Sequence, residues 1–557
     1  MRFGRSQRPY LTRIVELTMP TVISISSTKS VRTLRHAVQS SAGQALVICV
    51  LALAWSASLI GAQVFHANWG IVDDHEIFWF LGTEHSLPFK DIFPTLLTKT
   101  ELAGPLLMQG RFRPIYYFLR VIETAFWGEN VHLWYLSRVL MFATFIAGTY
   151  LATARLIGHA ASLALSGYAA TMTFWGDVWG RLGPAESYPA AALGVWLFSL
   201  IGMFQFQSRA FIRFSLLGLT LATLVLVGCK EPLMPFGAFS VAALAIWLWI
   251  NGPRLPGIVA LAACLLATAA VASVTLLQLS NRGADTYGRS ISLGDRTPIL
   301  LGALEETLWP VLAVCVLSLL MWNPMPTKWI RATSIFVASS AALMSLYVFE
   351  IVAYNGEWPT TIRYDFPGQL CVPAIFVGIV AYGSALDKLS PTTQGWRQLG
   401  LMVVLIALTE WAGPPASRIG LVQFEAVIRG NIVETSKFSD SLAEVVGEAR
   451  AQPEWPIILD GFGYQSYEPM LSTATYLWHY EVEAPVVLRY HSLDADKTSP
   501  FAMSLAERLQ RIAVEGEATE YRLAPFSAAQ SLMDKGCISI GVNGDPDPRC
   551  FGRRLWQ

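Results

Sequence analysis

The sequence predicts a polytopic α-helical membrane protein with about eleven transmembrane helices, followed by a soluble C-terminal α/β domain. Of its 557 residues, 53% are hydrophobic and 14% are charged, whereas a typical soluble domain is about 25% charged. The 19 tryptophans include Trp69, Trp175 and Trp322 near the ends of apolar stretches, as is typical of membrane-interface belts. The net charge is zero, so the composition indicates no nucleic-acid partner.

A helix needs about 20 apolar residues to cross the roughly 30 Å hydrocarbon core. Such stretches define a transmembrane region at residues 45–413. The predicted spans are 45–66, 133–155, 157–174, 190–206, 212–228, 233–250, 257–279, 299–321, 332–353, 368–385 and 398–413. The basic segment 1–44 is too long for the n-region of an ordinary signal peptide, so we expect the first span to be a retained anchor.

The positive charges of the short connections predict the orientation. Segment 1–44 and the connections containing Arg209, Arg254 and Lys388 share one side if the spans alternate. We expect that side to be cytoplasmic, which leaves the C-terminal domain, residues 414–557, outside. Nearly every unusual polar cluster then falls on the outer face, which predicts that the active face is there.

The predicted first outer loop, residues 67–132, is too long to lack structure. Segment 91–103 mixes apolar and polar residues as an interfacial helix does. Pro114 suits the first turn of a second helix. The apolar stripe expected on that helix consists of Ile115, Leu119, Ile122 and Phe126.

An acidic cluster, Asp73-Asp74-His75-Glu76, lies in this loop soon after the first span. Ionisable residues at a bilayer are costly to maintain and usually mark function. A carboxylate near lipid, with a raised pKa, can remove the proton of an acceptor hydroxyl. The alternative is a helix cap, which explains one aspartate better than four polar residues. We therefore interpret Asp73 and Asp74 as catalytic candidates, and His75 and Glu76 as substrate-binding candidates.

Several basic residues on the same predicted face can bind a phosphate. Arg111 and Arg113 precede the second loop helix, where arginine forks and helix-terminal amides suit phosphate oxygens; snorkelling to lipid headgroups explains them nearly as well. Lys230-Glu231 ends an apolar span, where a charged pair is expensive unless it is paired or bound. The alternative there is a self-contained ion pair. Arg363, near a later span, is suited to stabilising a departing phosphate.

The loop from Trp175 to Tyr188 packs aromatic, acidic and basic residues together. Trp179 and Arg181 are substrate-binding candidates, because tryptophan faces suit sugar rings. Membrane-interface anchoring explains the tryptophans equally well. No metal-ligand spacing stands out, so no cofactor is assigned, although acid clusters would permit Mg²⁺ or Mn²⁺.

The C-terminal domain alternates predicted helices and strands. Helices are expected from Ser439 to about residue 450 and over 499–514. Short apolar strands are expected at 456–460, 485–490 and 537–541. Cys537 and Cys550 pair if the domain lies in an oxidising compartment, and are otherwise free thiols.

The acidic pair Asp73-Asp74 in a long first outer loop, the juxtamembrane helices and Lys230-Glu231 at a later span end resemble the GT-C superfamily of glycosyltransferases. The resemblance covers about residues 45–413. It implies inverting transfer of a sugar from a polyprenyl-phosphate carrier to a hydroxyl of a glycan, lipid or protein, at the outer face of a bacterial inner membrane. Asp73 or Asp74 would be the base, and Lys230 with an arginine would bind the carrier phosphate.

Two other functions stay open at this point. A polysaccharide polymerase or ligase would use a diphosphate carrier, but such enzymes tend to carry their long outer loops later in the chain. A transporter or flippase of lipid-linked saccharides would bury charges in the middle of its spans and often show internal symmetry. Here Arg138 and Glu350 lie near span ends, and no internal repeat is visible.

Overall fold

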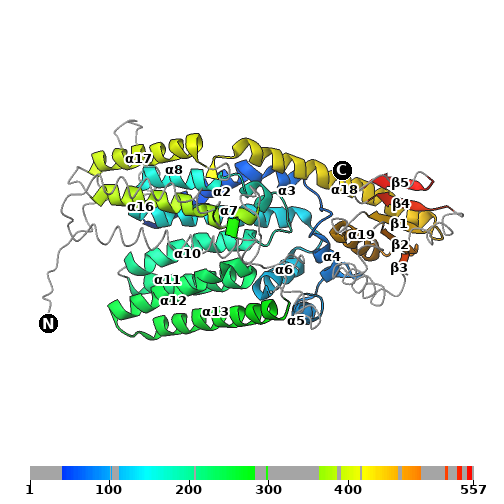
Figure 1. Cartoon of the computed structure of the whole chain (residues 1–557), viewed down its shortest axis with the longest axis horizontal. Coiled ribbons are helices and arrows are strands. Elements are labelled where there is room, and N and C mark those ends of the chain that lie inside the picture. Colours follow the sequence, from blue (N-terminus) through cyan, green and yellow to red (C-terminus); the bar gives the residue numbers. More distant parts are fainter. Residues whose placement is uncertain are drawn as a thin grey trace, which may run out of the picture.

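A bundle of long helices is joined to a small parallel sheet by one helix, α18 (Leu421–Ala451), as Figure 1 shows. The predicted order, a helical membrane region followed by a C-terminal region with helices and a sheet, is confirmed. The computed structural model describes residues 41–100, 102, 112–205, 208–282, 297–298, 301, 363–385, 391–413, 417–461, 467–490, 521–524, 536–541 and 549–554.

The described helices of the bundle match most of the predicted spans. They are α2 (Ser41–Ile60), α7 (Val131–Ile157), α8 (His159–Ala170), α10 (Ser187–Gln205), α11 (Arg209–Cys229), α12 (Met234–Asn251), α13 (Leu255–Arg282), α16 (Cys371–Ala385) and α17 (Pro391–Ala412). Within the described ranges, six are long and apolar enough to cross a membrane: α2, α7 and α10 to α13. At 12 residues, α8 is too short for the span predicted at 157–174. The spans predicted at 299–321 and 332–353 lie outside the described residues.

Glycines bring two central helices of the bundle into close contact. A Cβ added at Gly148 of α7 would lie 2.3 Å from the carbonyl oxygen of Gly194 in α10. A Cβ added at Gly194 would lie 2.7 Å from the carbonyl oxygen of Thr144. Membrane helices use such small residues to bring their backbones together. Lipid tails are as apolar as the side chains, so close packing rather than apolar burial holds the helices together.

The first loop forms helices in both segments where the sequence predicts them. The loop contains α3 (Ala62–His66), α4 (His75–Leu81), η1 (Phe89–Asp91), α5 (Ile92–Thr98) and α6 (Pro114–Trp127). On the apolar stripe predicted for α6, Phe126 is 60% exposed. The buried residues are Tyr116, Tyr117, Arg120, Val121 and Thr124. The buried face of α6 therefore includes polar side chains, and Ile115 and Leu119 of the apolar stripe pack partly buried against the same core.

The linking helix α18 begins earlier than the sequence predicts. Ser439 was expected to cap it, whereas the helix starts at Leu421 and continues for 31 residues. Buried side chains follow a helical period from Phe424 and Ile428 to Val445 and Ala449. One continuous buried face thus replaces the predicted start, and α18 packs against both α3 and α9 (Trp175–Trp179).

The C-terminal sheet has five strands, all parallel, in the order β3-β2-β1-β4-β5. The three predicted strands are confirmed as β1 (Ile457–Gly461), β2 (Val486–Tyr490) and β4 (Ile538–Gly541). The structure also contains three elements that are not among the predicted ones, β3 (Tyr521–Ala524), β5 (Phe551–Arg554) and the helix α19 (Tyr467–His479). The helix predicted at 499–514 lies outside the described residues. A disulfide joins Cys537 to Cys550.

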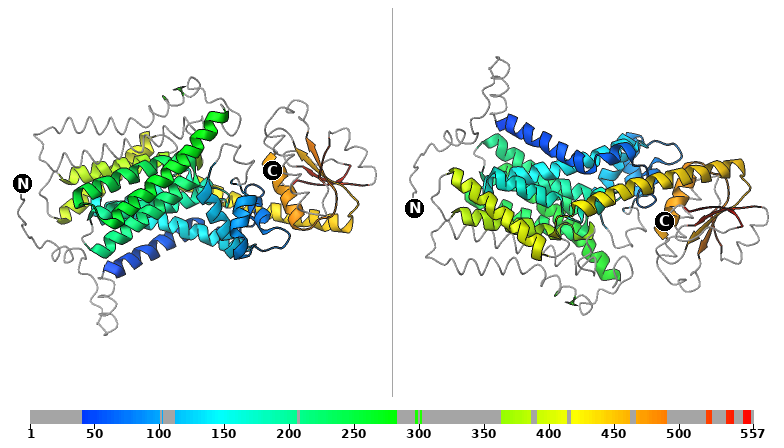
Figure 2. Two further views of the ribbon diagram at one scale, coloured as in Figure 1. Left: turned by 90° about the horizontal axis from the view of Figure 1, so that it is seen from below. Right: turned by 90° about the horizontal axis from the view of Figure 1, so that it is seen from above.

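The C-terminal domain and the first loop share one apolar core. The ring centroids of Phe78 in α4 and Tyr476 in α19 are 4.5 Å apart, and those of Trp79 and Trp478 are 5.2 Å apart. The hydroxyl of Tyr476 also donates to the carbonyl oxygen of Gly70, at 2.7 Å. In Figures 1 and 2, the sheet and α19 accordingly lie at the end of the bundle that carries the first-loop helices.

Cys550→Ser should lower the stability of the C-terminal domain by about 2–3 kcal/mol, because a disulfide restricts the unfolded chain and this one spans 13 residues. The change is measured as a lower Tm of the full-length protein in detergent and faster proteolysis of the domain. Cys49→Ser, at an exposed free cysteine, is the control. Equal Tm and protease resistance in both variants would contradict the prediction.

Candidate active site

Asp73 is held in an unusual backbone conformation directly before α4. Its φ is +67°, in the left-handed region that residues other than glycine rarely adopt. Gly183 approaches it so closely that an added Cβ would lie 2.0 Å from the Asp73 Cβ. Only glycine therefore fits at position 183. Strained backbone of this kind is concentrated at functional sites.

The carboxylate of Asp73 faces a cation and stays partly accessible. Its Oδ2 lies 3.5 Å from Nη1 of Arg363, and the two side chains are 27% and 23% exposed. Burial by itself raises the pKa of Asp73, but the positive charges of Arg363, His75 and Arg120 together hold it below the ordinary value. The backbone N–H of Arg363 donates to Asp177 at 3.2 Å. Asp73 is therefore an ionised carboxylate at neutral pH.

Asp74 lies next to Asp73 in sequence but in a different environment. It is 3% exposed, and its Oδ2 accepts a hydrogen bond from the backbone N–H of Gly70 at 2.7 Å. Burial raises the pKa of Asp74 to about 7, in spite of the positive charge of Arg120 and the Gly70 bond. Its side chain makes no capping hydrogen bond to α4, so the helix-cap alternative does not explain it.

Arg120 connects the two aspartates to the rest of the protein. Its side chain is fully buried and lies 4.0 Å from Oδ1 of Asp74. One guanidinium N–H donates to the carbonyl oxygen of Leu182 at 2.8 Å and another to that of Asp73 at 3.5 Å. Arg120 is not among the candidates predicted from the sequence. The one local feature of the sequence that points to it is its position four residues from both Tyr116 and Thr124, which places all three on the same face of α6.

His75 and Glu76 each bind another side chain of the protein. Nδ1 of His75 lies 2.7 Å from the hydroxyl of Ser472 in α19. Glu76 accepts hydrogen bonds from the hydroxyls of Tyr116 at 3.1 Å and Tyr117 at 3.5 Å. Burial and the charge of Glu76 raise the pKa of Tyr116 well above its ordinary value, so this phenol stays a donor. The substrate-binding roles expected for His75 and Glu76 stay predictions.

Lys230 pairs with a glutamate that is not among the predicted site residues. Its Nζ lies 2.7 Å from Oε1 of Glu186, with the two side chains 3% and 4% exposed. Burial by itself raises the pKa of Glu186, but Lys230 and Arg363 lower it below the ordinary value. Glu231 instead accepts from the backbone N–H of Phe112 at 3.2 Å. The adjacent Lys230–Glu231 ion pair considered as an alternative is therefore wrong.

The other candidate cations lie near this cluster or outside the described residues. Arg113 donates to the hydroxyl of Tyr117 at 3.1 Å and lies over the ring of Tyr116, 4.9 Å from its centroid. Arg181 lies 3.7 Å from Asp177 and is 41% exposed. Arg111 is not among the described residues.

Trp179 does not offer a face to a sugar in this structure. Its side chain is wholly buried and stacks on Phe142 with ring centroids 4.8 Å apart. A second stacked ring, Trp175, lies 5.6 Å away. The expected sugar-stacking role is therefore corrected to that of a core residue.

The site thus combines an accessible ionised carboxylate, a buried carboxyl that titrates near neutrality, and two cations at the end of membrane helices. Asp73, Arg363, Glu186 and Lys230 interact in succession. Paired carboxyls with separated pKa values are typical of acid–base sites. Cations beside them suit an anionic substrate or leaving group.

No family model matches the sequence, and no curated protein matches it. The structure is similar to that of ArnT from Cupriavidus metallidurans bound to undecaprenyl phosphate, with 15% identity, coverage of 88% of this chain and 91% of that chain, and a TM-score of 0.43. It is also similar to the oligosaccharyltransferase of Archaeoglobus fulgidus in complex with Zn and sulfate, with 12% identity, coverage of 83% and 66%, and a TM-score of 0.34.

Both are GT-C membrane glycosyltransferases, the class that the sequence resembles. At these TM-scores, neither likeness assigns a substrate, an activity or a residue role to this chain.

Asp74→Asn is expected to stabilise the protein increasingly as the pH rises from 5 to 8. The pKa of Asp74 is about 7 in the folded protein, against 3.8 for an ordinary aspartate. The folded state therefore keeps a proton that the unfolded state loses, and wild-type stability falls as the pH rises across this interval. The full effect is on the order of a few kcal/mol.

The test compares Tm values of the variant and the wild type in detergent at each pH. Asp440→Asn, on the exposed face of α18, is the control and should show a flat difference. A flat difference for Asp74→Asn as well would contradict the pKa of about 7.

Proposed function

We propose that the protein is a GT-C-type glycosyltransferase, which transfers a sugar from a polyprenyl-phosphate carrier to an acceptor hydroxyl at the outer face of a bacterial inner membrane. The observation that supports this most directly is the accessible, ionised Asp73 beside Arg363, at the end of a helix bundle that can span a membrane. A base and a phosphate-binding cation meet there, within reach of a lipid-borne substrate.

Asp73, rather than Asp74, is the proposed general base. A base must come within hydrogen-bond distance of the proton that it removes, and the Asp73 side chain is 27% exposed whereas that of Asp74 is 4% exposed. The acceptor oxygen forms a bond to the anomeric carbon as the bond to the carrier phosphate breaks. The hydroxyl proton passes to the Asp73 carboxylate, and polyprenyl phosphate leaves. Asp74 is then a positioning residue.

Arg363, which is 23% exposed, is proposed to contact the departing phosphate, and Lys230, buried beside Glu186, to add positive charge behind it. Negative charge grows on that phosphate during the reaction, and fixed cations in a site of low polarity stabilise it strongly. Arg363 also lowers the pKa of Asp73. A donor phosphate that attracts Arg363 would weaken this effect and make Asp73 a stronger base. Donor binding and activation of the base would then be coupled through one guanidinium group.

Asp73→Asn should reduce sugar transfer by about 10²- to 10⁴-fold, the usual contribution of a general base. Asp74→Asn should have a smaller effect, about tenfold, because it only positions its neighbour. The assay supplies purified protein with polyprenyl-phosphate sugars and a membrane extract as acceptor, and measures sugar transferred and polyprenyl phosphate released. Asp440→Asn is the matched control.

Equal transfer by the wild type and Asp73→Asn would remove Asp73 from the chemistry. A folded wild type that consumes none of the polyprenyl-phosphate donors would overturn the proposed function and favour transport. A protein active only with diphosphate-linked donors would be a polymerase or ligase instead.

Gly183→Ala should reduce transfer at least about tenfold, because the new methyl group would occupy the position of the Asp73 Cβ and misplace the base. The matched control is Gly430→Ala, where an added Cβ meets nothing within 4 Å. Both variants are checked for folding by size-exclusion chromatography and Tm. A folded Gly183→Ala protein with wild-type transfer would show that the position of Asp73 does not matter.

A further inference from the structure

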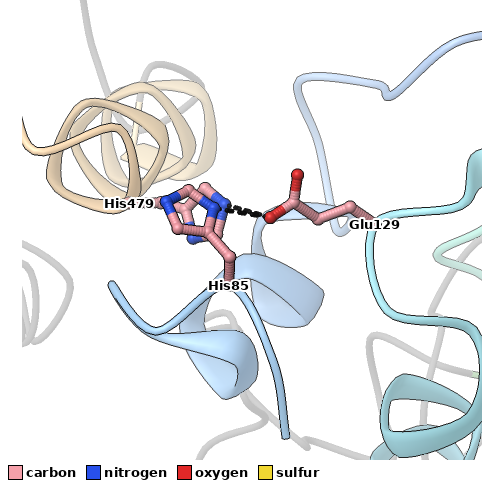
Figure 3. Close-up of side chains that lie close together, drawn as sticks. All are labelled: His85, Glu129 and His479. Carbon is pink, nitrogen blue, oxygen red and sulfur yellow. Dashed lines mark hydrogen bonds and ion pairs between the residues drawn. The ribbon is translucent and has the colours of Figure 1, made fainter.

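Three side chains that suit a metal ion meet where the C-terminal domain contacts the first loop (Figure 3). His85 follows α4, Glu129 lies in the turn between α6 and α7, and His479 is the last residue of α19. Nδ1 of His85 lies 2.6 Å from Oε1 of Glu129, and Nε2 of His479 lies 3.0 Å from the same oxygen. All three ligand atoms lie within 4.8 Å of one another.

The hydrogen bonds of His479 define its tautomer, that is, which ring nitrogen carries the proton and which has a free lone pair. Its Nδ1 lies 2.7 Å from the carbonyl oxygen of Gly82, and a carbonyl oxygen can only accept, so Nδ1 carries the proton. A neutral His479 therefore turns the lone pair of Nε2 toward Glu129. Two acceptors at 3.0 Å repel each other unless a positive centre lies between them.

A second proton on His479 could supply the positive charge between Nε2 and Glu129, but it would cost free energy. Its side chain is 0% exposed, and a buried imidazolium loses the hydration of its charge. His85 stands in contact as well, with ring centroids 4.2 Å apart, which places a second ring beside the same carboxylate. A divalent cation would satisfy the carboxylate and both imidazole lone pairs at once.

We propose that His85, Glu129 and His479 bind one divalent transition-metal ion, for which Zn²⁺ is the best chemical match. Two imidazoles and one carboxylate form a ligand set that Zn²⁺ accepts, with bonds of about 2.0–2.2 Å. Tetrahedral ligands at that bond length lie about 3.3 Å apart. The separations of 2.6 and 3.0 Å from Glu129 would expand slightly, and the separation between the two imidazole nitrogens, which lie within 4.8 Å, would shorten as the exposed side chain of His85 turns. His85 and Glu129 are 44% and 36% exposed, which leaves the fourth position to water.

The surroundings of the three residues hold them in this arrangement. Histidines that bind metals usually donate their other N–H to a carbonyl or carboxylate, which fixes the tautomer, and Gly82 accepts that bond from His479. Gly82 has a φ of +67° and His85 a φ of +54°, so the turn after α4 adopts a backbone that most residues avoid. The turn thereby brings both the carbonyl oxygen and one ligand to α19.

The ion would join the C-terminal domain to the membrane region. Its ligands come from α19 on one side and from the two turns of the first loop on the other, and the 7-residue helix α4 lies between His85 and Asp73 in the chain. The ion is thus a structural link that holds α4 in place, and it takes no part in the proposed transfer. This inference does not depend on the proposed function.

The test uses the full-length protein, purified in detergent without a histidine tag and dialysed against a chelator. Addition of Zn²⁺ should give one bound equivalent by elemental analysis and raise the Tm. Co²⁺ should give the visible absorption of a tetrahedral nitrogen–oxygen site. His85→Ala and Glu129→Gln should each weaken Zn²⁺ binding more than about 100-fold, since even outer-shell partners account for 10- to 100-fold. His66→Ala, at an exposed histidine of α3, should bind Zn²⁺ as the wild type does.

Both ligand variants change partly exposed side chains, so they test the site even if His479→Ala fails to fold. A wild type that binds no Zn²⁺ after dialysis, with a Tm that responds to pH alone, would show that a shared proton satisfies the cluster and would overturn the proposal. Undiminished binding in both His85→Ala and Glu129→Gln would do the same. Neither outcome bears on sugar transfer.

Discussion

The buried charge of Arg120 is the constraint on which the candidate site depends. A guanidinium with no exposed surface is tolerated only when hydrogen-bond acceptors surround it. Arg120 donates to the carbonyl oxygens of Leu182 and Asp73 and lies 4.0 Å from a carboxyl oxygen of Asp74. These partners come from the first loop and from the segment before α10. Arg120 thereby ties two distant parts of the chain to α6 and leaves the Asp73 side chain facing Arg363.

The two aspartates show how little adjacency in sequence says about chemistry. Burial raises the pKa of Asp74 to about 7, whereas nearby cations lower the pKa of Asp73 and keep it ionised. The two carboxyl groups can occupy different environments because the backbone at Asp73 is left-handed and Gly183, which has no side chain, leaves room for the Asp73 side chain. The site therefore depends as much on space as on charge.

The C-terminal domain belongs to the same folding unit as the first loop. Phe78 and Tyr476 lie in one apolar core, and bonds from Tyr476 to Gly70 and from His75 to Ser472 fix the backbone on either side of the aspartates. Loosening of the domain should therefore change the geometry at Asp73. An accessory domain packed in this way can influence an active site without contributing a catalytic group.

Hydropathy and local chemistry in the sequence alone determined most of the described membrane helices, the two helices of the first loop, three of the strands and the acidic cluster. Each of those features is defined by residues that are close together in the sequence, such as the roughly 20 apolar residues that cross a bilayer. Only the tertiary structure decided that Arg120 is buried, that Lys230 pairs with Glu186 rather than Glu231, and that Trp179 is a core residue. The partners in these contacts lie tens of residues apart in the chain, so no local pattern predicts them.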